Sequence, residues 1–344
     1  MTPREAFAEQ AEACRTLGSP FMDRLLRLCA ERLDRITAVG RTVLDWPGNP
    51  HYSADSVPLR LAGGLHRLVL DGSSAALAAC YPPARTDDDA LWAAIAQAFR
   101  DHEAALLTAL KSPPQTNEIR RSVALIPALH LIAGETGLPL RLSELGASAG
   151  LNLLCDRFRL WAGKVAYGPA GAPVTVRPDW TGPPPTPAAL SVIDRAGVDL
   201  NPVDLGDPGQ QLRLLSYLWP DQAGRMAMTR AAIGIARQAT PDLARADAID
   251  WLETRLESPE RGTAHVVYNT VAWQYFAPDS QARGNALLER AGAAATRDHA
   301  IAHLAMEGDG GRGAALTLRL WPGGRTRQLA RVDFHGRWIE WSMS

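Results

Sequence analysis

The chain has 344 residues, of which 46% are hydrophobic and 21% charged, and its formal net charge is -1. This composition excludes a disordered or fibrous protein, and the length exceeds what one hydrophobic core usually organises, so we expect two domains. The near-neutral charge disfavours nucleic acid and anionic membranes as partners, because there is no basic field to attract them.

The four cysteines, Cys14, Cys29, Cys80 and Cys155, lie far apart in the chain. Their spacing matches neither a zinc site nor a disulfide framework, and the eight histidines form no metal-binding motif. We therefore expect buried reduced thiols and no metal. The first ten residues lack the apolar run of a secretory signal, and no later stretch is apolar enough to span a bilayer. Both observations favour a cytoplasmic protein.

The first third of the chain carries apolar side chains at helical spacing, for example Leu91, Ile95 and Phe99. This periodicity predicts a helical N-terminal domain at residues 1–112. The second domain is then expected at residues 113–344.

From residue 138 onward the sequence alternates between strands and helices. The expected strands lie at 140–145, 191–200, 265–270 and 300–307, and the expected helices at 210–237 and 285–295. This order predicts an α/β fold with a mainly parallel, Rossmann-like sheet covered by helices on both faces.

Two further segments depart from this alternation. The last forty residues predict antiparallel strands at 315–321, 328–334 and 338–341, a C-terminal hairpin pattern that distinguishes a methyltransferase sheet from a dinucleotide-binding one. The Pro- and Gly-rich stretch at 157–190 is expected to be an inserted loop or arm without regular structure.

A turn of small residues follows the first expected strand, and it contains Glu144, Gly146, Ser148, Gly150 and Asn152. Glycine and alanine let a ligand approach the backbone, and the start of the next helix presents N–H groups to a polar or anionic group. The pattern resembles the acidic-x-Gly-x-Gly-x-Gly motif of class I S-adenosylmethionine methyltransferases, with serine in place of the middle glycine. The resemblance implies that these residues bind S-adenosylmethionine or its product S-adenosylhomocysteine. A close-packed turn without a ligand is the alternative.

Three more polar positions resemble the later motifs of these enzymes. Asp199 ends a strand, where the family's carboxylate accepts hydrogen bonds from the ribose hydroxyls; an Asx turn before Pro202 is the alternative. Asp247 and Ala248 resemble the pair that faces the adenine amino group; a helix N-cap is the alternative. Asn269 lies at a strand's C-terminal end, where open α/β sheets place their ligands.

A hydrolase is the alternative from another class. Residues 146–150 also satisfy the G-x-S-x-G pattern of a nucleophile elbow, with Ser148 as the nucleophile. Asp199 or Asp247 and one of three later histidines would complete a triad; these histidines are His299, His303 and His335. We disfavour this hypothesis because the elbow should follow several strands, whereas the upstream sequence is helical.

Nearly the whole chain also resembles an uncharacterised bacterial family, a domain of unknown function. The shared motifs are Gln115 to Glu118, Glu144 to Leu153, Gly18-Ser19-Pro20, Leu65 to Leu68, Asn201-Pro202 and His335-Gly336. The resemblance implies a methyltransferase-like fold and brings no established reaction.

The catalytic residues are not identified by any motif, and the candidates are Glu118, Asn269 and His66. Gln115, Asn117 and Glu118 are expected to form a rim or lid over the ligand, with helix capping as the alternative. We therefore predict an S-adenosylmethionine-dependent methyltransferase acting on a small molecule. A protein that binds a nucleotide or cofactor without catalysis is the main alternative.

Overall fold

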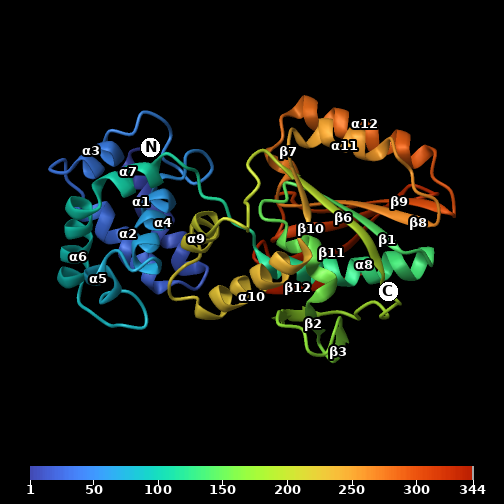
Figure 1. Cartoon of the computed structure of the whole chain (residues 1–344), viewed down its shortest axis with the longest axis horizontal. Helices are drawn as coiled ribbons and strands as arrows, with labels where there is room; N and C mark the ends of the chain where they lie inside the picture. Colours follow the sequence, from blue (N-terminus) through green and yellow to red (C-terminus); the bar gives the residue numbers. More distant parts are fainter. Residues whose placement is uncertain (343–344) are drawn as a thin grey trace. The chain divides into compact units, whose positions relative to one another are not determined.

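The computed structural model describes residues 1–342 and divides into two compact units (Figure 1). The first unit comprises residues 1–116 and 206–230, and the second comprises residues 117–205 and those from 231 onward. The first boundary lies close to the predicted one at residue 112, but residues 206–230, which were expected in the second domain, belong to the first unit.

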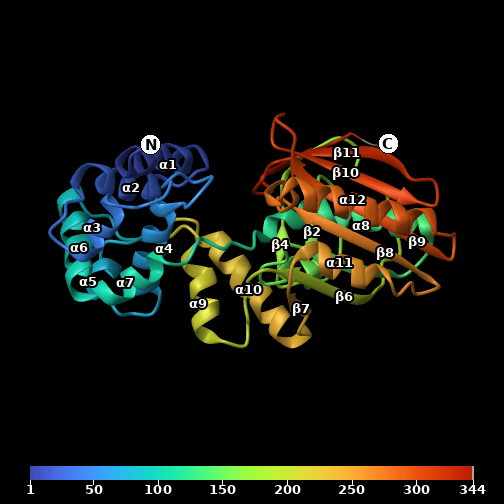
Figure 2. The same ribbon diagram turned by 90° about the horizontal axis from the view of Figure 1, so that it is seen from above.

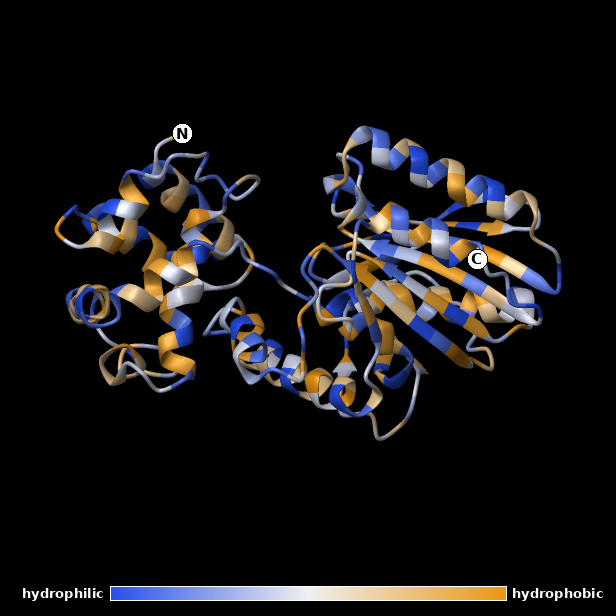
Figure 3. Cartoon of the chain, turned by 45° about the horizontal axis from the view of Figure 1, so that its top comes forward, coloured by the Kyte–Doolittle hydropathy of each residue, from blue (hydrophilic) through white to orange (hydrophobic). Residues whose placement is uncertain are grey.

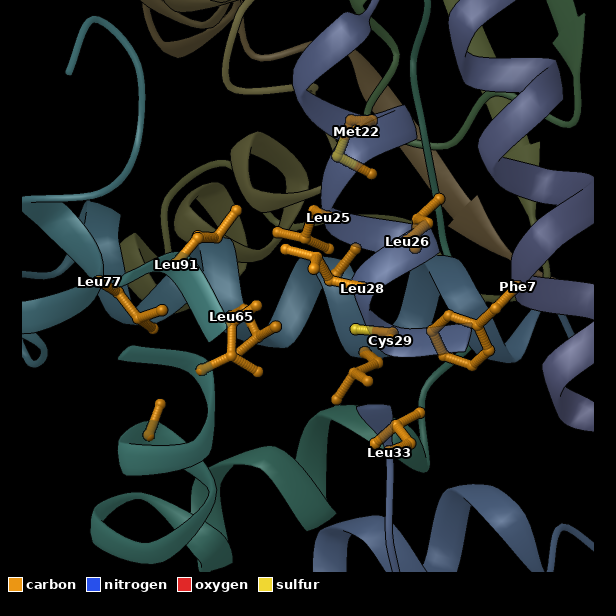
Figure 4. Packing of buried hydrophobic residues seen from close by; sticks show 14 of the residues in the cluster. Phe7, Met22, Leu25, Leu26, Leu28, Cys29, Leu33, Leu65, Leu77 and Leu91 are labelled. Atoms are coloured by element: carbon orange, nitrogen blue, oxygen red, sulfur yellow. The ribbon is translucent and has the colours of Figure 1, made fainter. Parts of the chain in front are cut away.

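The first unit is helical, as the periodicity of residues 1–112 predicts. Its helices are α1 (Pro3–Thr16), α2 (Pro20–Arg32), α3 (Ala38–Leu44), α4 (Val57–Leu70), α5 (Ala75–Ala78), α6 (Asp88–Asp101), α7 (Glu103–Leu110) and α9 (Pro208–Ser216). Apolar side chains of α1, α2, α4 and α6 meet in a core that includes Phe7, Leu25, Leu65 and Leu91 (Figure 4). Burial of this face stabilises helices that are individually too short to persist in water.

Residues 206–230 join this unit through Trp219, which packs in its apolar core, and through the carboxylate of Asp221. Asp221 accepts hydrogen bonds from the Ser19 hydroxyl at 2.5 Å and from the Phe21 amide at 2.9 Å. Ser19 itself caps α2, whose first residue is Pro20. The start of α2 is thus held by a residue 200 positions later in the chain, and local sequence carries no sign of this contact.

In the described part of the second unit, nine strands form one sheet in the order β5-β12-β11-β10-β9-β8-β1-β6-β7 (Figure 2). The parallel part contains β1 (Leu140–Leu145), β6 (Val192–Asp199), β7 (Asp242–Arg245), β8 (Thr263–Thr270) and β9 (His299–Gly308). The antiparallel part contains β10 (Ala314–Trp321), β11 (Arg325–Val332) and β12 (Trp338–Trp341), and the edge strand β5 (Asp179–Thr181) pairs with β12 in parallel. The expected strands are confirmed to within three residues, and β7 is an additional strand.

Helices cover both faces of this sheet, as predicted. Figure 1 shows α11 (Ala248–Leu256) and α12 (Pro278–Ala293) on one side and α8 (Ser122–Thr136) on the other. α10 (Ala223–Ala239) begins within the first unit and ends within the second. In Figure 3, α12 is the uppermost helix of this unit and shows both hydrophilic and hydrophobic turns, as expected for a helix with one buried face.

The expectation that residues 157–190 lack regular structure is wrong. This insertion contains the short strands β2 (Arg159–Ala162), β3 (Val165–Tyr167) and β4 (Thr175–Val176), which pair with one another, and β5 (Asp179–Thr181), which pairs with β12. Phe158 and Tyr167 are buried and anchor the insertion. Prolines and glycines mark its turns, but tertiary burial of the intervening aromatic residues produces the strands.

Candidate functional site

The C-terminal ends of the parallel strands bring several predicted site residues to one edge of the sheet. Numbered along the chain, the parallel strands lie in the order 3-2-1-4-5, and the direction of this order reverses between β1 and β8. Gly146 follows β1, Asp199 ends β6, Asp247 follows β7, and Asn269 lies near the end of β8. Open α/β sheets bind ligands at this type of reversal.

The turn after β1, residues 146–150, is called the cradle loop below. Gly146, Ser148 and Gly150 all have positive φ, at 74°, 53° and 67°. An added Cβ would lie 2.7 Å from the Cβ of Ala272 at Gly146 and 2.9 Å from Leu243 Cδ2 at Gly150. Both glycines are therefore required by neighbouring side chains as well as by backbone conformation. Ser148 adopts the left-handed region although it has a Cβ, which is uncommon for this residue type.

Most backbone amides of the cradle loop bind acceptors of the chain itself, which corrects the expectation of free N–H groups. Gly146 and Ala147 donate to Val198 O, Ser148 to Asp199 Oδ2, Gly150 to Ala147 O, and Leu151 to Asn117 Oδ1, at 2.8 to 2.9 Å. The expected helix after the loop is η2 (Leu151–Arg157), a 3₁₀ helix. The loop therefore presents few donors to a phosphate group.

Two carboxylates at this edge make the hydrogen bonds that the structural alternatives predict. Asp199 Oδ1 accepts from the Asn201 amide at 2.8 Å in an Asx turn, while its Oδ2 holds the Ser148 amide at 2.9 Å. Asp247 caps α11 by accepting from the amides of Ile249 and Asp250. Ala248 is the first residue of that helix. Asp199 is only partly buried, and each of its oxygens keeps a second lone pair for a ligand hydroxyl.

Glu144 lies beneath the cradle loop and is 2% exposed. The Tyr268 hydroxyl donates to its carboxylate at 3.2 Å. Burial raises the pKa of Glu144 to about 8, although the bond from Tyr268 and the charge of Arg121 act in the opposite direction. The carboxyl group is thus largely protonated at neutral pH, and a cation brought close to it would favour its ionisation.

Asn269 is buried in a hydrogen-bond network rather than facing open solvent. Its amide nitrogen donates to Glu307 Oε1 at 2.7 Å, and its oxygen accepts from His303 Nε2 at 3.0 Å. The same Glu307 oxygen accepts from the amides of Ala272 and Trp273 at 2.9 and 3.1 Å. Desolvation lowers the pKa of His303 to about 4 and keeps the imidazole neutral. Asn269 and Glu307 together therefore position the turn that packs against Gly146.

Sequence reasoning missed Glu307, although a signal for it exists. It is an acidic residue near the C-terminal end of β9, and the same criterion selected Asp199 at the end of β6. Trp273 lies in η3 (Trp273–Tyr275) just beyond β8, half-buried, and Tyr275 in the same turn is exposed. Tyr275 is thus available to a ligand, whereas Trp273 also contributes to packing.

Residues 117–121, which we call the strap, cross the C-terminal edge of the sheet. At one end Asn117 binds the Leu151 amide, and the Glu118 carbonyl accepts from Asn152 Nδ2 at 3.2 Å. At the other end Arg121 donates to the carbonyl of Thr270, the last residue of β8, at 2.8 Å and to Phe334 O, after β11, at 3.1 Å. Asn117 and Glu118 therefore combine capping with a position beside the cradle loop. Gln115 belongs to the first unit.

Buried polar atoms gather where the strap meets the cradle loop. Within residues 1–342, Ser122 Oγ, Ser148 Oγ and Asn152 Oδ1 are buried without a hydrogen-bond partner. Leaving such an atom unsatisfied costs roughly 1–3 kcal/mol, and native structures rarely tolerate it without a functional reason or a bound molecule. Ser148 lies in the cradle loop, and Ser122 and Asn152 lie within two residues of the strap and the cradle loop, which contact each other; this grouping favours a ligand site there.

The structure places His66 in the core of the first unit and gives its candidacy as a catalytic residue no support. It is buried, its Nδ1 lies 3.1 Å from Ser216 O, and its ring stacks on Tyr81. Burial lowers the pKa of this imidazole to about 4. The neutral ring therefore donates to a carbonyl and packs as a structural residue.

The hydrolase hypothesis also lacks the geometry it needs. A nucleophilic serine requires a histidine within hydrogen-bond reach, but Ser148 Oγ has no such partner in the described chain. His303 binds Asn269, and His299 lies at the opposite, N-terminal end of β9. Asp199 binds the Ser148 amide instead of orienting a histidine.

A surface hollow of about 950 Å³ is lined by residues of the first unit alone. Two of its arginines are paired: Arg24 with Asp88 at 2.6 Å and Arg32 with Asp89 at 2.7 Å. Its paired charges give no sign of a specific ligand. Residues 1–342 contain no group of three side chains that could hold a metal ion and no helix long and apolar enough to cross a membrane.

These features define an α/β protein with a large, mostly parallel central sheet and a candidate ligand site at the reversal of its strand order. The chain belongs to a bacterial family described as "Uncharacterized protein conserved in bacteria (DUF2332)", whose pattern matches residues 4–341. No curated protein and no solved structure matches the chain.

Proposed function

We propose that the protein is a methyltransferase that uses S-adenosylmethionine and acts on a small molecule. The observation that carries this proposal is the cradle loop at the strand-order reversal, with Asp199 beside it and unpartnered buried oxygens on Ser148 and Asn152. A ligand with several hydroxyl, amine and carboxylate groups would satisfy these atoms.

The residues at this edge fit the chemical groups of the cofactor. Asp199 would accept from the ribose hydroxyls through its remaining lone pairs. Ser148 Oγ and Asn152 Oδ1 would bind the amino-acid end, and Leu200, which is 69% exposed next to Asp199, offers apolar surface to the adenine. Asp247 and Ala248 follow the next strand at the same edge. When bound, the cofactor supplies a sulfonium methyl group that a nucleophile can accept.

The bonds of the cradle loop also favour this cofactor over a dinucleotide. A pyrophosphate is normally held by free amides at a glycine-rich turn and a helix N-terminus. Here the amides of Gly146, Ala147, Ser148 and Leu151 already have acceptors in the protein. S-Adenosylmethionine carries no phosphate and does not need them.

The role of the protein in this reaction is chiefly to bind and orient. Holding the acceptor and the methyl group together supplies much of the rate enhancement in a transfer of this kind. The buried Glu144 and Asn269 networks keep the cradle loop and the turn after β8 rigid. A rigid site maintains the alignment that the transfer requires.

Isothermal titration calorimetry with S-adenosylmethionine and S-adenosylhomocysteine tests the proposal. We expect micromolar binding by the wild type and binding about 30-fold weaker in Asp199→Asn, which loses charge-assisted hydrogen bonds. Asp279→Asn changes an exposed carboxylate on α12 in the same way and should bind like the wild type. A folded wild-type protein that binds neither compound at millimolar concentration would refute the proposal.

A second measurement separates an enzyme from a protein that only binds the cofactor. The wild type is incubated with methyl-labelled S-adenosylmethionine and a small-molecule extract of bacterial cells. A labelled product supports methyl transfer, whereas tight binding of the cofactor without any labelled product would favour the non-catalytic alternative.

A further inference from the structure

Three segments meet at one place at the edge of the sheet. They are the strap, the start of η2 and the turn after β11. The strap contributes Glu118, η2 contributes Asn152, and the turn contributes His335 and Gly336. The first and last of these segments are separated by more than two hundred residues in the chain, and no motif of the sequence assigns a joint role to them. Their meeting point therefore needs its own explanation.

We propose that His335, oriented by Glu118, is the general base that removes a proton from the methyl acceptor. The inference rests on the proposed function and names the class of acceptor. An acceptor that needs a base is a hydroxyl or a protonated amine. A carboxylate or a thioether has no proton to lose, because it reacts through a lone pair that is already free, and it therefore needs no general base.

The pair has the arrangement of a carboxylate that orients a histidine. His335 Nδ1 lies 3.5 Å from Glu118 Oε2, an ion-pair distance rather than a hydrogen bond, and Arg120 Nε lies 3.5 Å from the other carboxylate oxygen. The Glu118 side chain is 2% exposed, whereas that of His335 is 31% exposed. A buried carboxylate that faces Nδ1 favours the tautomer with its proton on Nδ1 and leaves Nε2 as the proton acceptor.

The turn that carries His335 is held firmly. Asp333 accepts from the amides of His335 and Arg337 at 3.0 and 3.2 Å, and Arg337 also donates to it through its guanidinium group. Gly336 has a φ of 66°, and an added Cβ there would lie 2.2 Å from Arg120 O. The turn is therefore pressed against the strap, and His335 is fixed relative to Glu118.

The His335–Glu118 pair lies at the same edge of the sheet as the cradle loop. β11 ends level with β9, because Ala314 pairs with both Val332 and Gly308. Arg121 binds the carbonyl of Thr270, the last residue of β8, and that of Phe334 after β11, and so links the end of β8 to the turn that carries His335. The unpartnered Asn152 Oδ1 belongs to a side chain that is 1% exposed and also binds the strap. It is the oxygen that the amino-acid end of the cofactor would bind, so a bound cofactor would lie beside this pair.

The proposed step balances in protons and electrons. Nε2 of His335 takes the proton from the acceptor's O–H or N–H group as the acceptor's lone pair bonds to the methyl carbon. The bond from that carbon to sulfur breaks, its electron pair stays on sulfur, and the imidazolium then releases its proton to water. Glu118 stabilises the positive charge on the ring and is a positioning residue, since it acts through His335.

The test combines calorimetry, methyl transfer and chemical rescue. His335→Ala and Glu118→Gln are compared with His102→Ala, a histidine of the first unit whose side chain forms no helix-capping bond. Each variant is titrated with S-adenosylhomocysteine and then assayed with methyl-labelled S-adenosylmethionine and a small-molecule extract, with and without added imidazole. The calorimetric titration also shows whether each variant is folded.

We expect all variants to bind S-adenosylhomocysteine within about threefold of the wild type. His335→Ala should transfer methyl groups at least 100-fold more slowly, and imidazole should restore part of the rate only in that variant. A wild type that binds no S-adenosylhomocysteine removes the proposed function itself. If the wild type binds it, the role of His335 is overturned by an absence of labelled product, by an unchanged rate in His335→Ala, or by a loss that imidazole does not restore.

Discussion

Replacing Glu144 with glutamine should change how the stability of the second unit depends on pH. Burial raises the pKa of this carboxyl from 4.5 in an exposed glutamate to about 8 in the folded protein. Between these values the folded state holds a proton that the unfolded chain has lost. The stability linked to this proton is fully present below pH 4.5 and is lost as the pH rises through 8. Glutamine has no such proton.

The magnitude follows from the size of the shift. One pKa unit corresponds to about 1.4 kcal/mol, so the difference in unfolding free energy between Glu144→Gln and the wild type should rise by about 4 kcal/mol from pH 4.5 to pH 8. The groups that act on Glu144 are Tyr268, Arg121 and Asp199, and Cys155 is buried nearby. They are present in both proteins, so their own titration largely cancels in the difference.

Amide hydrogen exchange in β1 and β8 is the appropriate assay, because the chain has two units and a global transition would mix their stabilities. The two proteins are compared at several pH values between 4.5 and 8, after correction for intrinsic exchange rates. A difference in free energy that stays constant within about 1 kcal/mol over this range would refute the reasoning. It would mean that Glu144 is ionised in the folded protein despite its burial.

Three further substitutions test the packing around the candidate site. Ser148→Gly should raise the unfolding free energy by about 1 kcal/mol, because glycine adopts the positive φ of this position without strain; chemical denaturation measures it, and a loss of stability would contradict the strain. Gly146→Ala should lower the unfolding free energy by about 2 kcal/mol or more, because the new Cβ would collide with Ala272 and the backbone at this position is left-handed. An unchanged unfolding free energy would show that the turn after β8 moves freely. Asp221→Ala should destabilise the first unit by about 2 kcal/mol through the loss of two hydrogen bonds at the start of α2; exchange in α2 should rise while exchange in β1 stays unchanged.

The fold class and the position of most strands could be predicted from the sequence because they depend on local patterns. The strand Leu140–Leu145 and the glycine turn after it form a contiguous segment whose hydrophobicity and small residues are visible without the structure. β7 escaped prediction because it has only four residues and half of them are exposed. So short a strand is stabilised by pairing with β6 rather than by its own pattern.

The candidate site was predictable in part, since the residues at strand ends were found from the rule that open α/β sheets bind ligands there. Their hydrogen bonds were not predictable. Asp199 holds the Ser148 amide and Asn269 holds Glu307, and both partners lie tens of residues away in the sequence. Whether a carboxylate is free for a ligand or binds the backbone depends on distances that only the folded chain defines.

The sequence by itself determined most of the helices and the longer strands and where small or acidic residues interrupt them, because these properties follow from spacing and side-chain chemistry over short stretches. Only the tertiary structure decided that residues 206–230 belong to the helical unit, that the insertion at 157–190 forms strands, and that Glu118 faces His335. The physical reason is that these outcomes depend on contacts between segments far apart in the chain. Such contacts form when buried surface and hydrogen bonds outweigh the loss of conformational entropy, a balance that no local pattern contains.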